Sequence, residues 1–105
     1  MKRTAITLSP KLAGTRIQIG LAFDGERIVD VRVDLHKVGS YGRELHHAVA
    51  ALASGMLRRG ATAGEVGAIL RGTEGGPVGA VEDLDGVTHA LSVADLLGQV
   101  LAVYR

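Results

Sequence analysis

The residues with the clearest capacity for chemistry lie in one short segment, Lys37-Val38-Gly39-Ser40-Tyr41-Gly42-Arg43. Its glycines let the backbone turn, and a helix is predicted to begin directly after that turn. The first N–H groups of a helix have no partner inside it, so they can bind an anion that the helix dipole also attracts. Lys37 and Arg43 add positive charge. The segment is therefore a candidate phosphate site, while Ser40 could instead serve as a simple N-cap.

Two adjacent histidines, His46 and His47, invite interpretation as a metal site. Adjacent side chains on a helix point about 100° apart, whereas side chains that share a face are three or four residues apart. Neither histidine is followed four residues later by a histidine or a carboxylate. We therefore expect no bound metal, and we place at least one of these histidines at the surface or at an interface.

Other reactive side chains lack the spacing that catalysis or calcium binding requires. The acidic run 82–85 is rich in oxygen donors but does not fit a twelve-residue calcium loop, which favours a solvated acidic turn. Ser40, His47 and Asp34 are the residue types of a nucleophile, a base and an orienting acid, but no G-x-S-x-G elbow accompanies them. We expect a protein that is not an enzyme and that uses no cofactor.

Composition limits the class of protein. The 105 residues, 47 % of them hydrophobic, suffice for one core, so we expect a single domain over residues 1–105. The absence of cysteine excludes a disulfide framework, a thiolate metal site and thiol redox chemistry. No apolar run approaches the ~18 residues of a membrane span, and the first residues do not resemble a signal peptide. These features predict a soluble, cytoplasmic protein.

The net charge of +1 conceals an uneven distribution along the chain. Residues 1–71 carry a net charge of +5, whereas residues 72–104 contain five acidic residues and neither lysine nor arginine. Such a bipolar molecule could steer an anion to its basic part or bring copies together head to tail. An unevenly charged, solvated surface explains the pattern equally well.

Alternating apolar runs at residues 15–23 and 28–35 predict an antiparallel hairpin around Asp24-Gly25. To keep both apolar faces on one side, we predict a three-residue loop that pairs Phe23 with Arg27. The resulting cross-strand neighbours are Leu21 with Val29 and Ile19 with Val31.

Helical periodicity marks three further segments. Residues 43–59 carry an apolar face that we expect to pack on the core, formed by Leu45, Ala48, Val49, Leu52 and Met56. Thr62 and Glu65 form a capping box for a shorter helix, and Ser92 and Asp95 form a second box for the last helix.

Small residues are concentrated between positions 48 and 55 of the first helix, which we expect to end at Gly60. They could provide a second face for packing between copies of the protein, or they could allow the helix backbone to lie close to the sheet where the two cross. With a short strand at residues 4–8, and a loop or irregular hairpin at 73–91, the pattern predicts an α+β fold. A small antiparallel sheet, the N-terminal hairpin plus the short strand, would pack against about three helices.

Several short motifs carry a family resemblance through their order. They are Lys2-Arg3-Thr4-Ala5-Ile6-Thr7, Arg16 to Phe23 with Asp24-Gly25, the strand to Leu35, Lys37-x-Gly39-Ser40, the alanine-rich helix ending at Gly60, Leu70-Arg71-Gly72 and Ser92-x-x-Asp95-Leu96. In this order they resemble the TSCPD domain, over nearly the whole chain. That family is named for a Thr-Ser-Cys-Pro-Asp motif, is similar to the C-terminal region of adenosylcobalamin-dependent ribonucleotide reductases, and has small free-standing members. Here Leu91-Ser92-Val93-Ala94-Asp95 keeps only the serine and the aspartate, which argues against a thiol role.

The resemblance implies an accessory domain of nucleotide metabolism. Ribonucleotide reduction needs a thiyl radical and a cysteine pair, which this chain lacks. We therefore expect a homo-oligomeric module that binds a nucleotide or another phosphate-bearing ligand. It would regulate a reductase or sequester a nucleotide signal, as small phage proteins do. The expected ligand-binding residues are Lys37, Gly39, Ser40 and Arg43 at the phosphate, and Tyr41 or a histidine such as His47, from the same or a neighbouring copy, at the base.

The alternative is a protein-interaction module that binds no small molecule and uses the sheet and the alanine-rich helix as its interface. Nucleic acid fits poorly as a partner, because stacking platforms interleave aromatic and basic residues and only Tyr41 is placed for that role. A membrane partner is not expected.

Overall fold

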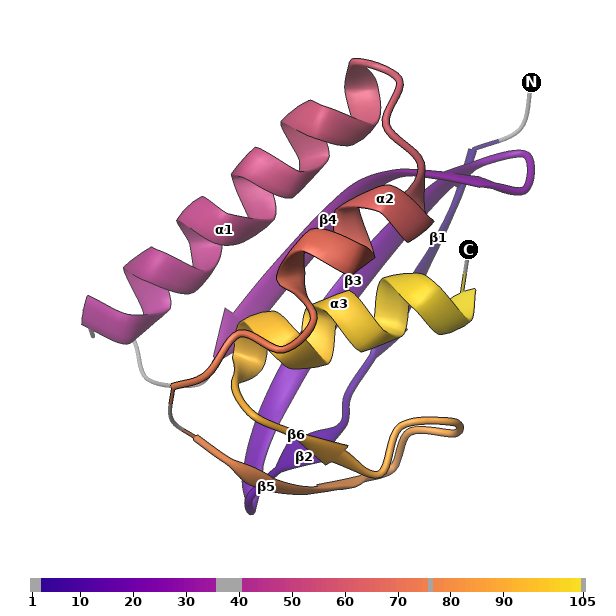
Figure 1. Ribbon diagram of the computed structural model, residues 1–105. Coiled ribbons are helices and arrows are strands. Elements are labelled where there is room, and N and C mark those ends of the chain that lie inside the picture. The colour runs from indigo at the N-terminus through magenta and orange to yellow at the C-terminus, as the bar shows by residue number, and fades with distance from the viewer. Residues whose placement is uncertain (1–2, 36–40, 76, 105) are drawn as a thin grey trace.

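The computed structural model describes residues 3–35, 41–75 and 77–104 and has the predicted α+β architecture (Figure 1). Within these ranges the strands are β1 (Arg3–Leu8), β2 (Lys11–Leu12), β3 (Thr15–Asp24), β4 (Arg27–Leu35), β5 (Gly79–Glu82) and β6 (His89–Ala90). The helices are α1 (Tyr41–Arg58), α2 (Ala63–Leu70) and α3 (Val93–Tyr104). All strand pairings are antiparallel, and β3 lies between β4 on one side and β1 and β2 on the other. The sheet is larger than predicted, because β2 continues to β5 and β6.

The register of the β3–β4 hairpin differs from the prediction. Asp24 pairs with Arg27 across a two-residue loop, and a β-bulge follows, so that Leu21 pairs with Val31 and not with Val29. The extra residue in the bulge reverses the alternation of side chains along β4. Ile28 is therefore buried on the same side as Val31, which a two-residue loop without a bulge would not permit. The predicted pairing of Phe23 with Arg27 and of Ile19 with Val31 was wrong for this reason: Phe23 pairs with Ile28, and Ile19 with Val33.

Helix α1 packs through a different face from the one predicted. Its buried residues are Ala50, Ala53, Ser54 and Leu57, whereas Leu45, Leu52 and Met56 are exposed. The helix lies along β4 (Figure 1), where small side chains allow the two backbones to come close. Of the two interpretations of the small residues, packing against the sheet is therefore the one observed. Of the predicted face, Val49 is half-buried against the core, whereas Leu45, Leu52 and Met56 face outward.

The ends of α1 and α2 follow the predicted local chemistry. Gly60 has φ +106°, and the N–H groups of Gly60 and Ala61 donate to the carbonyls of Leu57 and Met56, which makes a Schellman motif. At the start of α2, Thr62 and Glu65 form the predicted reciprocal capping box. Hydrogen bonds to Thr62 lower the pKa of the exposed Glu65 carboxyl.

The segment between α2 and α3 is the irregular hairpin that was one of the two predictions for it. Strands β5 and β6 pair at Gly79 with Ala90 and at Ala80 with His89. Asp83, at the end of β5, lies 3.0 Å from Arg16 of β3. One charge of the acidic stretch is thus neutralised by the basic part of the chain.

Candidate functional site

The predicted phosphate segment is only partly within the described residues. Lys37, Gly39 and Ser40 lie outside them, so the predicted roles of these three residues are neither supported nor contradicted. The backbone of Tyr41 begins α1 and that of Arg43 belongs to its first turn, about two residues earlier than the predicted helix start. The predicted loop therefore does lead directly into a helix. His47 lies one to two turns farther along, and its side chain is described.

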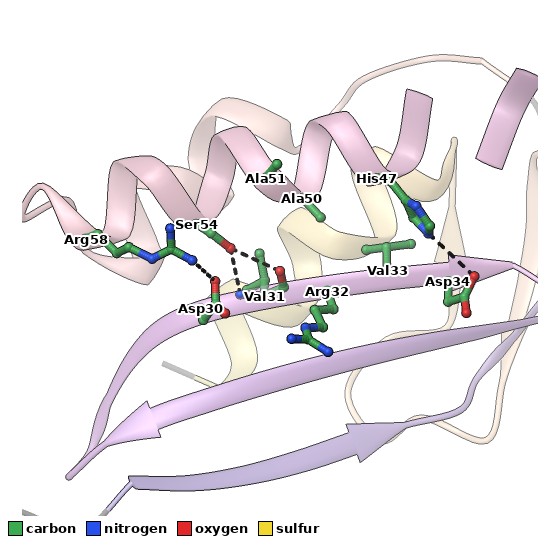
Figure 2. A pocket seen from close by; sticks show the side chains of 10 residues that line it. All are labelled: Asp30, Val31, Arg32, Val33, Asp34, His47, Ala50, Ala51, Ser54 and Arg58. Atoms are coloured by element: carbon green, nitrogen blue, oxygen red, sulfur yellow. Dashed lines mark hydrogen bonds and ion pairs between the residues drawn. The ribbon is translucent and has the colours of Figure 1, made fainter. Parts of the chain in front are cut away.

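A cavity of about 440 Å³ lies between α1 and β4 (Figure 2). The residues that line it are Asp30, Val31, Arg32, Val33 and Asp34 from β4, and His47, Ala50, Ala51, Ser54 and Arg58 from α1. Its volume falls in the range of ligand pockets, roughly 300–1,000 Å³. Of the predicted ligand-binding residues, His47 is the one that the described structure places in this cavity.

Helix α1 covers the edge of β4 with which a further strand could otherwise pair. Ser54 Oγ donates to the Val31 carbonyl and accepts from the Val31 N–H, both at 3.0 Å. Since both main-chain groups of Val31 bond to Ser54, they point away from β3, as in a non-hydrogen-bonded pair of an antiparallel ladder. Ser54 thus satisfies the N–H and the C=O of Val31 on an edge strand, where unpaired main-chain groups could otherwise pair with a strand of another chain.

Replacing Ser54 with alanine should lower the free energy of unfolding by about 2 kcal/mol, because it leaves a buried N–H and C=O of Val31 unpaired. The side chain is only 3 % exposed, so water cannot easily substitute. Equilibrium denaturation by urea measures the loss. A change below about 0.5 kcal/mol, the usual size for a surface substitution, would contradict the proposed role of this serine.

Two contacts between a basic and an acidic side chain cross the cavity, one toward each end (Figure 2). Arg58 lies 3.0 Å from Asp30, and His47 Nε2 lies 3.5 Å from Asp34. Both pairs are partly exposed, so each contributes little to stability and can rearrange around a ligand. Arg32 lies between them on β4 and is exposed. The cavity therefore offers three cationic or titratable groups and two carboxylates within reach of one small molecule.

His46 does not join this group. It is half-buried, and its Nδ1 atom has no hydrogen-bond partner. Burial, and secondarily the neighbouring His47, lower the pKa of His46 below its ordinary value of 6.5. Both effects favour the neutral form of the imidazole. In the described parts of the chain, no three histidines or carboxylates come together in a way that could hold a metal ion.

The arrangement brings together two members of the considered nucleophilic triad. Asp34 and His47 are in contact, as an orienting acid and a base would be, while Ser40 lies outside the described residues. The hydroxyl of Ser54, which also lines the cavity, is held by both main-chain groups of Val31. A nucleophile needs a free hydroxyl next to its base, and Ser54 does not offer one.

Several cavity residues were missed by the sequence analysis, although a signal for them is present. Asp30, Arg32 and Asp34 alternate with buried valines, which places three charges on one side of β4. Ser54 is a polar residue within an otherwise small and apolar stretch of α1. What could not be read from the sequence is that α1 lies directly beside these charges.

The serine and aspartate that open α3 lie elsewhere, at the junction of α2 and α3. The predicted capping box is half present: Ser92 Oγ accepts from the Asp95 N–H at 2.9 Å, but the Asp95 carboxylate does not return to Ser92. It accepts instead from the N–H groups of Gly72 and Leu91 and from the Gln99 amide. These two residues thus fasten the end of α2 to the start of α3, with no opening to the cavity.

Comparisons with known proteins identify one relationship. The model of a family described as the TSCPD domain matches residues 2–105. No curated protein and no solved structure matches the chain. Among the described residues, no helix is both long and apolar enough to cross a membrane.

Proposed function

Because this chain belongs to the TSCPD family, we propose that it is a non-catalytic module that binds a nucleotide or a similar phosphate-bearing ligand in the cavity between α1 and β4. The observation that carries the proposal is the position of this cavity. It has the volume of a small-ligand site and lies beside the helix into which the glycine-containing segment leads.

The ligand would lie along α1. Lys37, Gly39, Ser40 and Arg43 would bind the phosphate at the start of the helix, where N–H groups and the helix dipole favour an anion. Tyr41 or His47 would contact the base. The exposed Arg32 supports this assignment, because a guanidinium can both attract a phosphate and stack on a base.

The biological role that fits such a module is accessory to nucleotide metabolism in the cytoplasm, where it would regulate a reductase or sequester a nucleotide signal. The lack of cysteine supports a binding role, since reductase chemistry requires thiols. A homo-oligomer is part of the same proposal.

Thermal melting with a panel of nucleotides tests the proposal. A ligand at a hundredfold its dissociation constant adds about 2.7 kcal/mol to the free energy of unfolding. For a domain of this size, that corresponds to an increase in Tm of about 10 °C or more. A Tm that stays constant with every nucleotide and with inorganic phosphate would overturn the proposal.

A variant that fills the cavity locates the site. Ala51 is exposed at the cavity wall, so Ala51→Trp should abolish the ligand-induced increase in Tm while leaving the unliganded fold intact. Ala68→Trp is a matched control, because Ala68 is an exposed alanine on α2. Charge reversal of Lys37 and Arg43 should weaken binding as well. Equal ligand-induced shifts in Ala51→Trp and Ala68→Trp would exclude the cavity as the binding site.

A second candidate function is a protein-interaction module without a small ligand. The outward-facing Leu45, Leu52 and Met56 of α1 favour it, since large apolar side chains grouped on one face often mark an interface. Co-purification of a protein partner, together with no response to any nucleotide, would select this function over the first.

A further inference from the structure

Helix α1 presents an apolar face to solvent on the side opposite the sheet. Leu52 is 72 % exposed, Leu45 is 48 % exposed and Met56 is 37 % exposed. The helix has 18 residues, a length of about 27 Å, and it forms one outer side of the molecule (Figure 1). This surface, Leu45, Ala48, Leu52, Gly55, Met56 and Arg59, is called the outer face of α1 below.

The spacing on the outer face is that of a helix-pairing seam. Leu45, Leu52 and Arg59 follow one another at intervals of seven residues, with Ala48 and Met56 beside that row. A seven-residue repeat keeps side chains facing a second helix along its length. A Cβ atom added at Gly55 would meet open space, so a second backbone could approach closely at this point.

We propose that the outer face of α1 binds the same face of a second copy of this chain, with the two α1 helices antiparallel around a two-fold axis. None of the residues of the outer face lines the cavity between α1 and β4, although Ala51, which is next to Leu52 in the chain, does.

The charges at the two ends of α1 favour a second copy of this chain as the partner that covers the outer face. Glu44 lies near the first turn of α1 and Arg59 just after its last turn, and neither has an ion-pair partner among the described residues. In an antiparallel pair, Glu44 of one copy faces Arg59 of the other, and the two-fold axis repeats the contact. Glu44 borders one end of the outer face and Arg59 lies at the other end, so the face together with this border is complementary to itself, as a symmetric dimer requires.

The same alignment brings small residues and Leu52 together near the two-fold axis. With Glu44 opposite Arg59, the axis passes between Ala51 and Leu52, so the two Leu52 side chains lie next to each other. Ala48 then faces Gly55 of the second copy, where both side chains are small. Antiparallel helices also bring opposite ends of the two helix dipoles together.

The proposal can be tested by measuring the oligomeric state of the full chain and of a Leu52 variant by sedimentation equilibrium. The wild-type protein should form a dimer as its concentration rises, and Leu52→Glu should be monomeric throughout. Because Leu52 is largely exposed, this variant should retain its far-UV circular dichroism. Ile69→Glu is the matched control, since Ile69 is 63 % exposed on α2 and away from the outer face. A wild-type protein that stays monomeric, or equal dimerisation of Leu52→Glu and Ile69→Glu, would overturn the proposal.

A charge exchange tests the antiparallel alignment. Glu44→Arg and Arg59→Glu should each raise the dimer dissociation constant by about threefold or more, and the double variant should restore it. Failure of the double variant to recover dimerisation would refute the pairing of Glu44 with Arg59.

The absence of cysteine permits a direct measure of proximity. Leu52→Cys should form a disulfide-linked dimer under mild oxidation, because the two copies of residue 52 lie next to the axis. Ile69→Cys should remain monomeric under the same conditions. Equal cross-linking of the two variants would show that residue 52 is not at an interface.

Discussion

Replacing Asp95 with alanine will lower the free energy of unfolding by about 4 kcal/mol, because hydrogen bonds to a charged group are worth about 1.5–3 kcal/mol each and are not fully additive. The carboxylate is 5 % exposed and accepts from the Gly72 N–H at 2.7 Å, the Leu91 N–H at 2.9 Å and the Gln99 amide at 3.0 Å. Its removal leaves two partly buried N–H groups unpaired. Urea denaturation measures the loss, with Asp85→Ala as the control, since Asp85 is exposed.

The same carboxyl should make stability depend on pH. Burial alone would raise the pKa of Asp95, but hydrogen bonds from Gly72, Leu91 and Gln99, and the charge of Arg71, hold it below its ordinary value of 3.8. The folded state therefore binds this proton less tightly than the unfolded state. The contribution is fully present above 3.8 and is lost as the pH falls through the lower, folded pKa.

Asp95→Asn isolates this effect, because it keeps the shape of the side chain and removes the titration. The difference in free energy of unfolding between the wild-type protein and Asp95→Asn should be constant near neutral pH and should shrink in acid below 3.8. A difference that stays constant into acid would show that the carboxylate charge does not contribute to folding.

Replacing Gly98 with alanine is the second substitution expected to have a large effect. Helices α2 and α3 approach most closely at Gly67 and Gly98, where a Cβ on Gly98 would lie 2.8 Å from the Arg71 nitrogen and 2.9 Å from the Gly67 oxygen. Both contacts are with backbone atoms that already bond to each other, so α2 would have to move. Overpacking of this kind costs about 1–3 kcal/mol.

The gain in helix propensity from glycine to alanine, about 1 kcal/mol, offsets only part of that cost. Because both close contacts are with backbone atoms, the cost should lie near the upper end of that range, about 3 kcal/mol. We therefore expect a net loss of about 2 kcal/mol for Gly98→Ala, measured by chemical denaturation. Gly55→Ala in α1 is the matched control: its added Cβ meets open space, so stability should rise. If both substitutions stabilise the protein, the close contact between α2 and α3 is not as the structure describes it.

Elements with local causes could be predicted from the sequence. The capping box of Thr62 and Glu65 and the end of α1 at Gly60 depend on residues only a few positions apart, and both were predicted and observed. The antiparallel hairpin follows from alternation within a single stretch of chain. The family resemblance likewise rests on the order of short motifs, and the TSCPD match over residues 2–105 confirms it.

Features that depend on which elements become neighbours could not be predicted. The helical periodicity of α1 was correct, but the outward direction of Leu52 was not foreseen, because apolar residues were expected inside. Periodicity shows that a helix has two faces, whereas only its packing partner decides which face is buried. Against the backbone of β4, the closest approach favours small residues over large ones.

The sequence by itself determined the long hairpin, the three helices with ends within about two residues, and the family, because these depend on residues close together in the chain. Tertiary structure alone decided the bulge that sets the hairpin register, the cavity between α1 and β4, and the link from Asp95 back to Gly72. Each of these joins residues that local propensity does not connect. The physical reason is that burial and hydrogen-bond satisfaction are properties of the assembled core, where a residue such as Ser54 gains its role only when β4 lies beside it.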